Sequence, residues 1–173
     1  MTPKRIAGVA LLAGMLLAAG CSWIAFAPPF DVTGAYRGVW SGTLNGDDRP
    51  RTCGMSLSLE HDGDYDLLQG FVFRGTATVY FTCSSLFDDI ADAGLPARIS
   101  TDVTGYVTRS GRVTLVSAET DSDTSLAVSI TGRGEDADGN GDMDALSGSW
   151  SLVVRVPDHD QFSLNGTVEA GRN

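Results

Sequence analysis

The segment 136–144 carries an oxygen-bearing side chain at every second position. Carboxylate and amide oxygens are the hard ligands that Ca²⁺ takes from proteins. Gly141 stands at the sixth position of the stretch, where an EF-hand-type loop needs a residue that permits a sharp turn. The pattern therefore indicates a calcium loop. Its expected ligands are the side chains of Asp136, Asp138 and Asn140, the backbone carbonyl of Asp142, and Asp144 directly or through water.

The same loop departs from an EF-hand in two ways. Its twelfth position is Ser147 rather than a bidentate glutamate, and no helix is expected on either side of it. The alternative interpretation is a solvated acidic loop in a chain that holds 22 acidic residues. We expect any bound calcium to be structural, holding a long hairpin closed. Additional oxygens could come from a neighbouring acidic segment with Glu119, Asp121 and Asp123.

Sequence motifs for covalent or hydrolytic catalysis are missing. The chain has no His-Glu-x-x-His, no Gly-x-Ser-x-Gly, no phosphate-binding loop and no paired Cys-x-x-Cys. His159 lies between Asp158 and Asp160, but no serine or cysteine nucleophile can be tied to it. We interpret it as a loop histidine among solvated charges, and we expect a protein that is not an enzyme.

The N-terminus has the features of a secretion signal. Lys4 and Arg5 precede an uncharged apolar run over residues 6–19, which is shorter than the ~20 residues that a membrane-spanning helix needs. The run ends Leu17-Ala-Ala-Gly-Cys21 and resembles the lipobox of bacterial lipoproteins, although leucine stands one place further from the cysteine than is usual. The resemblance implies removal of residues 1–20 and lipidation of Cys21; the alternative is an ordinary signal peptide with a chance cysteine.

The expected location is the cell envelope. Ser22 rather than aspartate follows the cysteine, which in a Gram-negative host points to the outer membrane. Residues 21–32 would form a short lipidated tether, and residues 33–173 a single domain. The aromatic side chains of the tether, Phe30 among them, would lie in the headgroup region or pack on the domain. The formal net charge of the whole chain is −10, and both cationic residues of the signal would be removed, so nucleic acid is excluded as a partner. The membrane, through the lipid anchor, is the expected partner.

Two cysteines, Cys53 and Cys83, remain after lipidation, and in an oxidising compartment they are expected to pair. The alternative is a pair of buried thiols. Hairpin turns at 61–64 and at residue 75 would place Cys83 roughly 17 Å from the level of Cys53, whereas a disulfide needs Cα atoms within about 7 Å. Either the turns between 65 and 83 are misplaced, or the chain bends back at Ser84, or the bond does not form.

Alternation of apolar and polar residues dominates the chain after residue 30, and each run is bounded by Gly, Asp, Asn or Pro. The pattern predicts an all-β fold, an antiparallel meander of about eight to nine strands that closes into a barrel or sandwich. One short helix is expected over 85–94, after a serine cap and before a glycine stop. The expected strands are 36–44, 53–60, 65–74, 76–83, 97–108, 112–118, 125–133, 145–156 and 161–168.

Gly38-Val39-Trp40 on the first expected strand, together with Arg155 at the end of a late strand, resembles the calycin pattern of lipocalins and avidins. Glycine-centred strands, such as Leu164-Asn-Gly-Thr, strengthen the similarity to lipocalin-like bacterial lipoproteins. The resemblance implies a closed barrel in which Trp40 and Arg155 are structural partners. The alternative for Trp40 is a generic core tryptophan on a strand.

Two functions remain open from the sequence. An eight-stranded barrel is just wide enough to be filled by its own side chains or to hold one small ligand. Calycins commonly hold apolar ligands, so the resemblance implies an envelope lipoprotein that binds a small apolar molecule. The alternative is a structural or interaction protein of the envelope, with a filled barrel, a calcium-stabilised loop and loops as its working surface.

Overall fold

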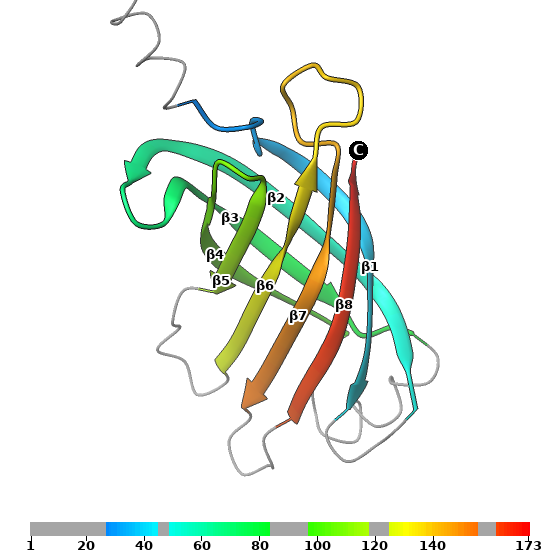
Figure 1. Cartoon of the computed structure of the whole chain (residues 1–173). Helices are drawn as coiled ribbons and strands as arrows, with labels where there is room; N and C mark the ends of the chain where they lie inside the picture. Colours follow the sequence, from blue (N-terminus) through cyan, green and yellow to red (C-terminus); the bar gives the residue numbers. More distant parts are fainter. Residues whose placement is uncertain (1–26, 45–48, 84–96, 118–124, 156–161) are drawn as a thin grey trace, which may run out of the picture.

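A computed structural model describes residues 27–44, 49–83, 97–117, 125–155 and 162–173 of the chain (Figure 1). The described residues form eight strands and no helix. The helix expected over 85–94 lies outside the described residues, as do Cys21 and the expected signal. None of the described residues belongs to a helix long and apolar enough to cross a membrane.

Eight antiparallel strands follow one another around a closed barrel, in which β8 pairs with β1. The expected all-β meander barrel is therefore confirmed, and the strand number is eight. The strands are β1 (Gly34–Leu44), β2 (Arg51–Asp66), β3 (Gly70–Tyr80), β4 (Arg98–Val107), β5 (Arg112–Ser117), β6 (Ser125–Glu135), β7 (Ala145–Arg155) and β8 (Phe162–Arg172).

The hairpin between β2 and β3 differs from the expectation. Turns were expected at 61–64 and at residue 75, but β2 continues to Asp66, and Gly75 lies inside β3, opposite Leu59. The register shifts between His61 and Tyr65, and Gly63 between them has a φ of 80°. The expected Asp-Gly turn is thus a β-bulge, which uses the same left-handed glycine that a tight turn would use.

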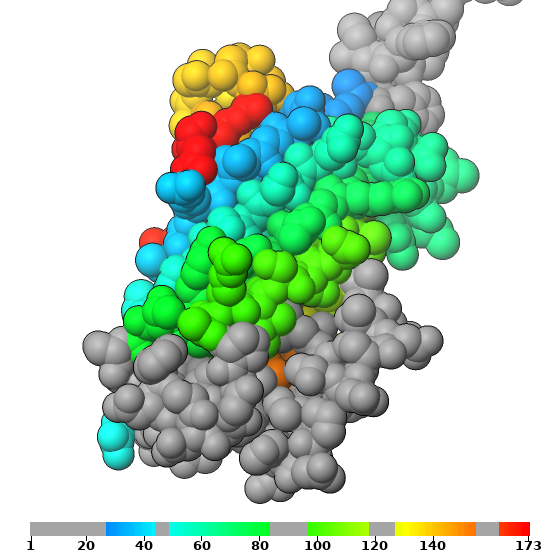
Figure 2. Space-filling model, turned by 180° about the vertical axis from the view of Figure 1, so that it is seen from behind, coloured from blue at the N-terminus to red at the C-terminus, as the bar shows by residue number. Residues whose placement is uncertain are grey.

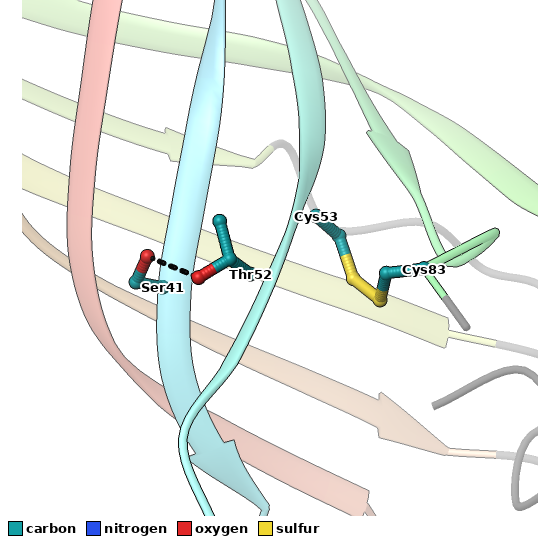
Figure 3. The surroundings of a disulfide bond; sticks show 4 residues. All are labelled: Ser41, Thr52, Cys53 and Cys83. Carbon is teal, nitrogen blue, oxygen red and sulfur yellow. Dashed lines mark hydrogen bonds between the residues drawn. A yellow bond between two sulfur atoms is a disulfide. The ribbon is translucent and has the colours of Figure 1, made fainter. Parts of the chain in front are cut away.

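The corrected hairpin explains how the two cysteines meet. Met55 pairs with Val79, so the register carries Cys53 to the level of Phe81, two residues before Cys83. The Cα atoms of Cys53 and Cys83 are 5.2 Å apart and the two residues form a disulfide. Figure 3 shows this bond on one side of β2 and the Ser41–Thr52 hydrogen bond on the other. The expected pairing is present, and the misplaced turns were the source of the apparent conflict.

The barrel interior is filled by alternate residues of every strand. Glycines interrupt this inner face where neighbouring strands approach closely. A Cβ atom on Gly38 would overlap the carbonyl oxygen of Glu169, and one on Gly166 would overlap that of Ser41. The glycine-centred pattern therefore allows close approach of β1 and β8. The largest fully buried side chains are Trp40, Tyr36, Phe73, Phe81, Leu57, Leu115, Ile130, Met143, Leu146, Leu152 and Val32.

One end of the barrel is capped by the residues that precede β1. Phe30 is 6% exposed and Val32 is fully buried, so both belong to the core although they lie within the expected tether. A Cβ atom on Gly134 would clash with the Phe30 ring, which shows how tightly the ring is seated. The same end carries the β2–β3, β4–β5 and β6–β7 hairpins (Figure 1).

Candidate functional site

The acidic loop connects β6 to β7 at the capped end of the barrel. Carboxylate oxygens of Asp136, Asp138 and Asp144 all lie within 4.8 Å of one another. Three negatively charged oxygen donors at this spacing suit a hard cation such as Ca²⁺, which takes six to eight oxygens at about 2.3–2.6 Å. The structure thus brings together three of the five expected ligand residues through their carboxylates.

Backbone hydrogen bonds shape this loop. The two carboxylate oxygens of Asp136 accept from the N–H groups of Gly139 and Gly141, at 2.8 and 3.0 Å. Both glycines have positive φ, 74° and 89°, which side-chain-bearing residues rarely adopt. Asp144 accepts from the N–H of Ala137 at 2.7 Å. The glycines therefore allow the chain to curl around its own carboxylates.

The other two expected ligands have different partners. Asn140 donates from its side-chain amide to Asp138 at 3.1 Å and accepts from the N–H of Asp142 at 2.7 Å. The carboxylate of Asp142 forms an ion pair of 2.6 Å with Arg172 on β8. The Asp142 side chain is therefore directed to β8 rather than to the carboxylate cluster, and a contribution of its backbone carbonyl to a metal stays a prediction.

A segment that we call the strap, residues 30–33, fastens the chain to this loop and to β2. Asp31 forms a parallel bridge with Asp142, donating its N–H to the carbonyl of Gly141 and accepting from the N–H of Met143. The Asp31 carboxylate accepts from the Thr33 N–H and lies 2.8 Å from Nδ1 of His61. The burial of Phe30 decides the alternative that the sequence left open for this aromatic, since it packs on the domain. The bridge between Asp31 and Asp142 was not predicted, because nothing in the local pattern of residues 27–33 indicates it.

Two titratable groups of the strap region have shifted pKa values. Burial alone would raise the pKa of Asp31, but hydrogen bonds from Thr33 and His61 hold it below its usual value. Burial raises the pKa of Tyr36 to about 12, against the opposing effect of Arg172. The Tyr36 hydroxyl donates to the carbonyl of Val32 at 2.9 Å, which ties the strap to the first strand.

The aromatic core centres on Trp40. Its ring lies 4.6 Å from that of Trp150 and 6.5 Å from that of Phe81, between centroids. The Trp150 indole N–H donates to the carbonyl of Ser41 at 3.4 Å, whereas the buried indole N–H of Trp40 has no partner among the described residues. Sequence reasoning missed both partner rings, although Ser-Gly-Ser-Trp150 repeats the glycine-centred pattern around Trp40.

The expected partner of Trp40 lies elsewhere along β7. Trp40 pairs with Val168, which pairs in turn with Gly148, seven positions before Arg155. Arg155 ends β7 opposite Ser125, and its side chain is outside what the structure describes. The pairing of Trp40 with Arg155 therefore stays a prediction, and the ring contacts described for Trp40 are those with Trp150 and Phe81.

A shallow groove runs over the outer face of β5–β7 and was not anticipated. Arg112 and Arg133 are directly opposite each other on β5 and β6, and both are exposed. Neither has an ion-pair partner among the described residues. Like charges at directly opposite positions repel each other. The groove is lined by Ser110, Arg112, Thr131, Gly132, Arg133 and Ser149.

No protein-family model, curated protein or solved structure matches this chain. The lipoprotein resemblance therefore rests on residues 17–21, and the calycin resemblance on Gly38, Trp40, Arg155 and the glycine-centred strands.

Proposed function

We propose that the protein is a lipid-anchored scaffold or interaction domain of the cell envelope, with a barrel filled by its own side chains. The observation that carries this proposal is the occupied interior. Tyr36, Trp40, Phe73 and Phe81 are all buried inside the barrel with almost no exposed surface. An eight-stranded barrel has room for little else where aromatic side chains of this size meet. The outer wall and the loops are then the surfaces available to partners.

Anchoring is supported by the strap. A lipidated Cys21 would lie nine residues before Phe30, whose ring is seated in the end of the barrel. The connection between lipid and barrel is therefore short, at most roughly 30 Å when extended. A short connection fastened at a fixed point holds one end of the barrel towards the bilayer. An outer-membrane location remains part of this proposal and rests on Ser22.

A second candidate function is favoured by one polar atom. The indole N–H of Trp40 is buried and has no hydrogen-bond partner among the described residues. Such a donor costs free energy unless a water or a ligand accepts from it. A small apolar ligand with a single acceptor, lying beside Trp40 and Trp150, would fill this role. This is the ligand-carrying alternative that the calycin resemblance implies.

Two measurements test these proposals. Cells that produce the full chain are grown with a palmitate analogue, alongside cells producing Cys21→Ser. We expect label and membrane fractionation for the unchanged chain, and loss of both in the variant; unlabelled protein in the unchanged strain would refute the anchor. Native mass spectrometry of the detergent-extracted protein then tests the interior. The lipidated polypeptide mass supports the scaffold, whereas an added mass of a few hundred daltons would favour the carrier.

A further inference from the structure

The tip of the β2–β3 hairpin carries the most exposed large hydrophobic side chains of the described residues. Leu67 is 83% exposed and Leu68 is 97% exposed, whereas the other exposed large hydrophobics, Val39 and Val116, reach only 43% and 45%. Two adjacent leucines with almost no protein contact lose the hydrophobic stabilisation that burial would give them. Their exposure on a hairpin tip is therefore a feature that a partner could use.

The hairpin holds these leucines in a fixed position. One carboxylate oxygen of Asp66 accepts from the N–H groups of Leu68 and Gln69, at 2.7 and 3.0 Å, which closes the turn. Behind the turn, the rings of Tyr65 and Phe71 pack 4.8 Å apart between centroids. The tilted contact of these rings and the turn closed by the Asp66 carboxylate restrain the hairpin, so the leucines project from a defined structure.

The tip lies at the end of the barrel where the chain arrives from residue 27. Figure 1 shows the hairpin reaching out beside the blue N-terminal residues, and Figure 2 shows the two adjoining from behind. The contact is direct, because His61 of β2 donates its N–H to the Thr33 hydroxyl at 3.1 Å. Leu67 is six residues beyond His61, so the tip extends about 20 Å from this contact. Cys21 is ten residues before Asp31, so the lipidated end of the chain reaches at most about 36 Å from the strap. The two lengths are of the same order, so the tip and the lipid can meet one membrane surface.

We propose that Leu67 and Leu68 insert into the bilayer that holds the lipidated Cys21, so that the hairpin tip is a second membrane contact. This inference rests on the proposed lipid anchoring. The anchor would keep the tip within a few tens of Å of the membrane surface, so that weak apolar contacts suffice to hold it there. The Arg109 guanidinium lies 5.9 Å from the centroid of the Tyr65 ring behind the tip. Arginine and tyrosine both suit the headgroup level, where an apolar body meets water.

The negative charge around the hairpin tip indicates which class of lipid the tip would contact. Asp64 and Asp66 lie next to the leucines, and the chain as a whole is acidic. Anionic headgroups would repel this surface, so the contact fits zwitterionic lipid.

The test uses the full lipidated chain, purified from membranes and reconstituted into phosphatidylcholine vesicles. Cys53 and Cys83 are joined in a disulfide and Cys21 would carry lipid, so Leu68→Cys introduces one free thiol for a fluorescent label. A matched chain carries the label at Val116→Cys on the barrel wall. We expect nitroxide-bearing lipids to quench the label at position 68 several-fold more strongly than the label at position 116.

Two further variants separate insertion from mere proximity. Leu67→Ser in the chain labelled at position 68 should lower the inserted population on the order of tenfold, because one buried leucine is lost. Val39→Ser in the same chain should leave the quenching unchanged. Equal quenching at positions 68 and 116 in protein that sediments with the vesicles overturns the membrane contact and leaves the anchor standing. Protein that stays in the supernatant overturns the anchor, and the contact with it.

Discussion

The Cys53–Cys83 disulfide closes a loop with a sequence separation of 30, and its contribution to stability can be worked from that length. In the chain-entropy model, such a cross-link removes about 12 cal/mol/K from the unfolded chain, which is roughly 3.6 kcal/mol at 25 °C. We therefore expect the double variant Cys53→Ala/Cys83→Ala to lose about 3–4 kcal/mol of unfolding free energy. Replacing both residues avoids a free thiol that could pair wrongly.

Urea denaturation of the full chain, followed by circular dichroism, measures this loss. The variant should unfold at lower urea with a steeper dependence on denaturant, because its unfolded chain is less compact. Reduced wild-type protein is the control: it keeps both sulfur atoms in the core but lacks the cross-link. If the entropic account is right, the reduced protein and the double variant have similar unfolding free energies.

Two results would refute this reasoning. A loss below about 1 kcal/mol in both proteins would mean that the unfolded chain already holds the ends of this loop together, or that native contacts oppose the bond. A large loss in the double variant combined with none in the reduced protein would assign the effect to packing around Cys53, which is buried.

Three other predictions follow from the described contacts. Arg133→Glu turns the repulsive pair with Arg112 into an attractive one and should raise the unfolding free energy by about 1 kcal/mol at low salt, with the gain shrinking in 1 M salt; an unchanged midpoint in urea would count against it. Burial raises the pKa of Tyr36 to about 12, so the contribution of its neutral hydroxyl to the free energy of unfolding should be fully present below pH 10 and be lost as the pH rises towards 12. Tyr36→Phe should remove this loss of stability at high pH, and a variant that still shows it contradicts the assignment. Calcium should raise the melting temperature, and a chelator should reverse the rise, if the carboxylate cluster binds it; Asp136→Asn should abolish the effect and Asp142→Asn should retain it.

The strand order follows from a property that sequence carries locally. One residue in two faces the core of a barrel, so apolar and polar residues alternate, and the alternation is visible without any knowledge of the partner strands. β1 shows it with Tyr36 and Trp40 buried and Arg37 exposed. The closed meander was predictable from this pattern because consecutive strands joined by short turns pair with each other.

The β2–β3 turn could not be placed in the same way. Asp62-Gly63 satisfies the local rules for a hairpin turn, and Gly63 does adopt the left-handed conformation that those rules anticipate. The choice between a turn and a bulge depends on the partner strand, since Leu59 must face Gly75 and Met55 must face Val79 for the inner faces to match. Register is a property of two strands together, and one strand's sequence does not contain it.

The candidate sites also differ in whether they lie within one short segment or join segments far apart in the sequence. The carboxylate cluster lies within nine consecutive residues, so the spacing of Asp136, Asp138 and Asp144 was enough to predict their approach. The Trp40–Trp150 contact joins the first strand to the seventh, and depends on the route of the chain around the barrel. The bridge between Asp31 and the acidic loop could not be predicted for a different reason, because it is made by backbone hydrogen bonds that any residue can form.

Arg172 unites the elements at the capped end of the barrel. Its guanidinium donates to the carbonyl of Thr33 and pairs with Asp142, while its backbone N–H donates to the carbonyl of Asp144. The strap, the acidic loop and the last strand are therefore bonded into one unit. A pulling force applied through a lipidated Cys21 would be distributed over β1, β2 and β8. It would not separate a single strand from the sheet, because a closed barrel has no free edge. If Cys21 is lipidated as proposed, an anchor fastened in this way would orient the barrel with the ends of β1, β3, β5 and β7 directed away from the bilayer.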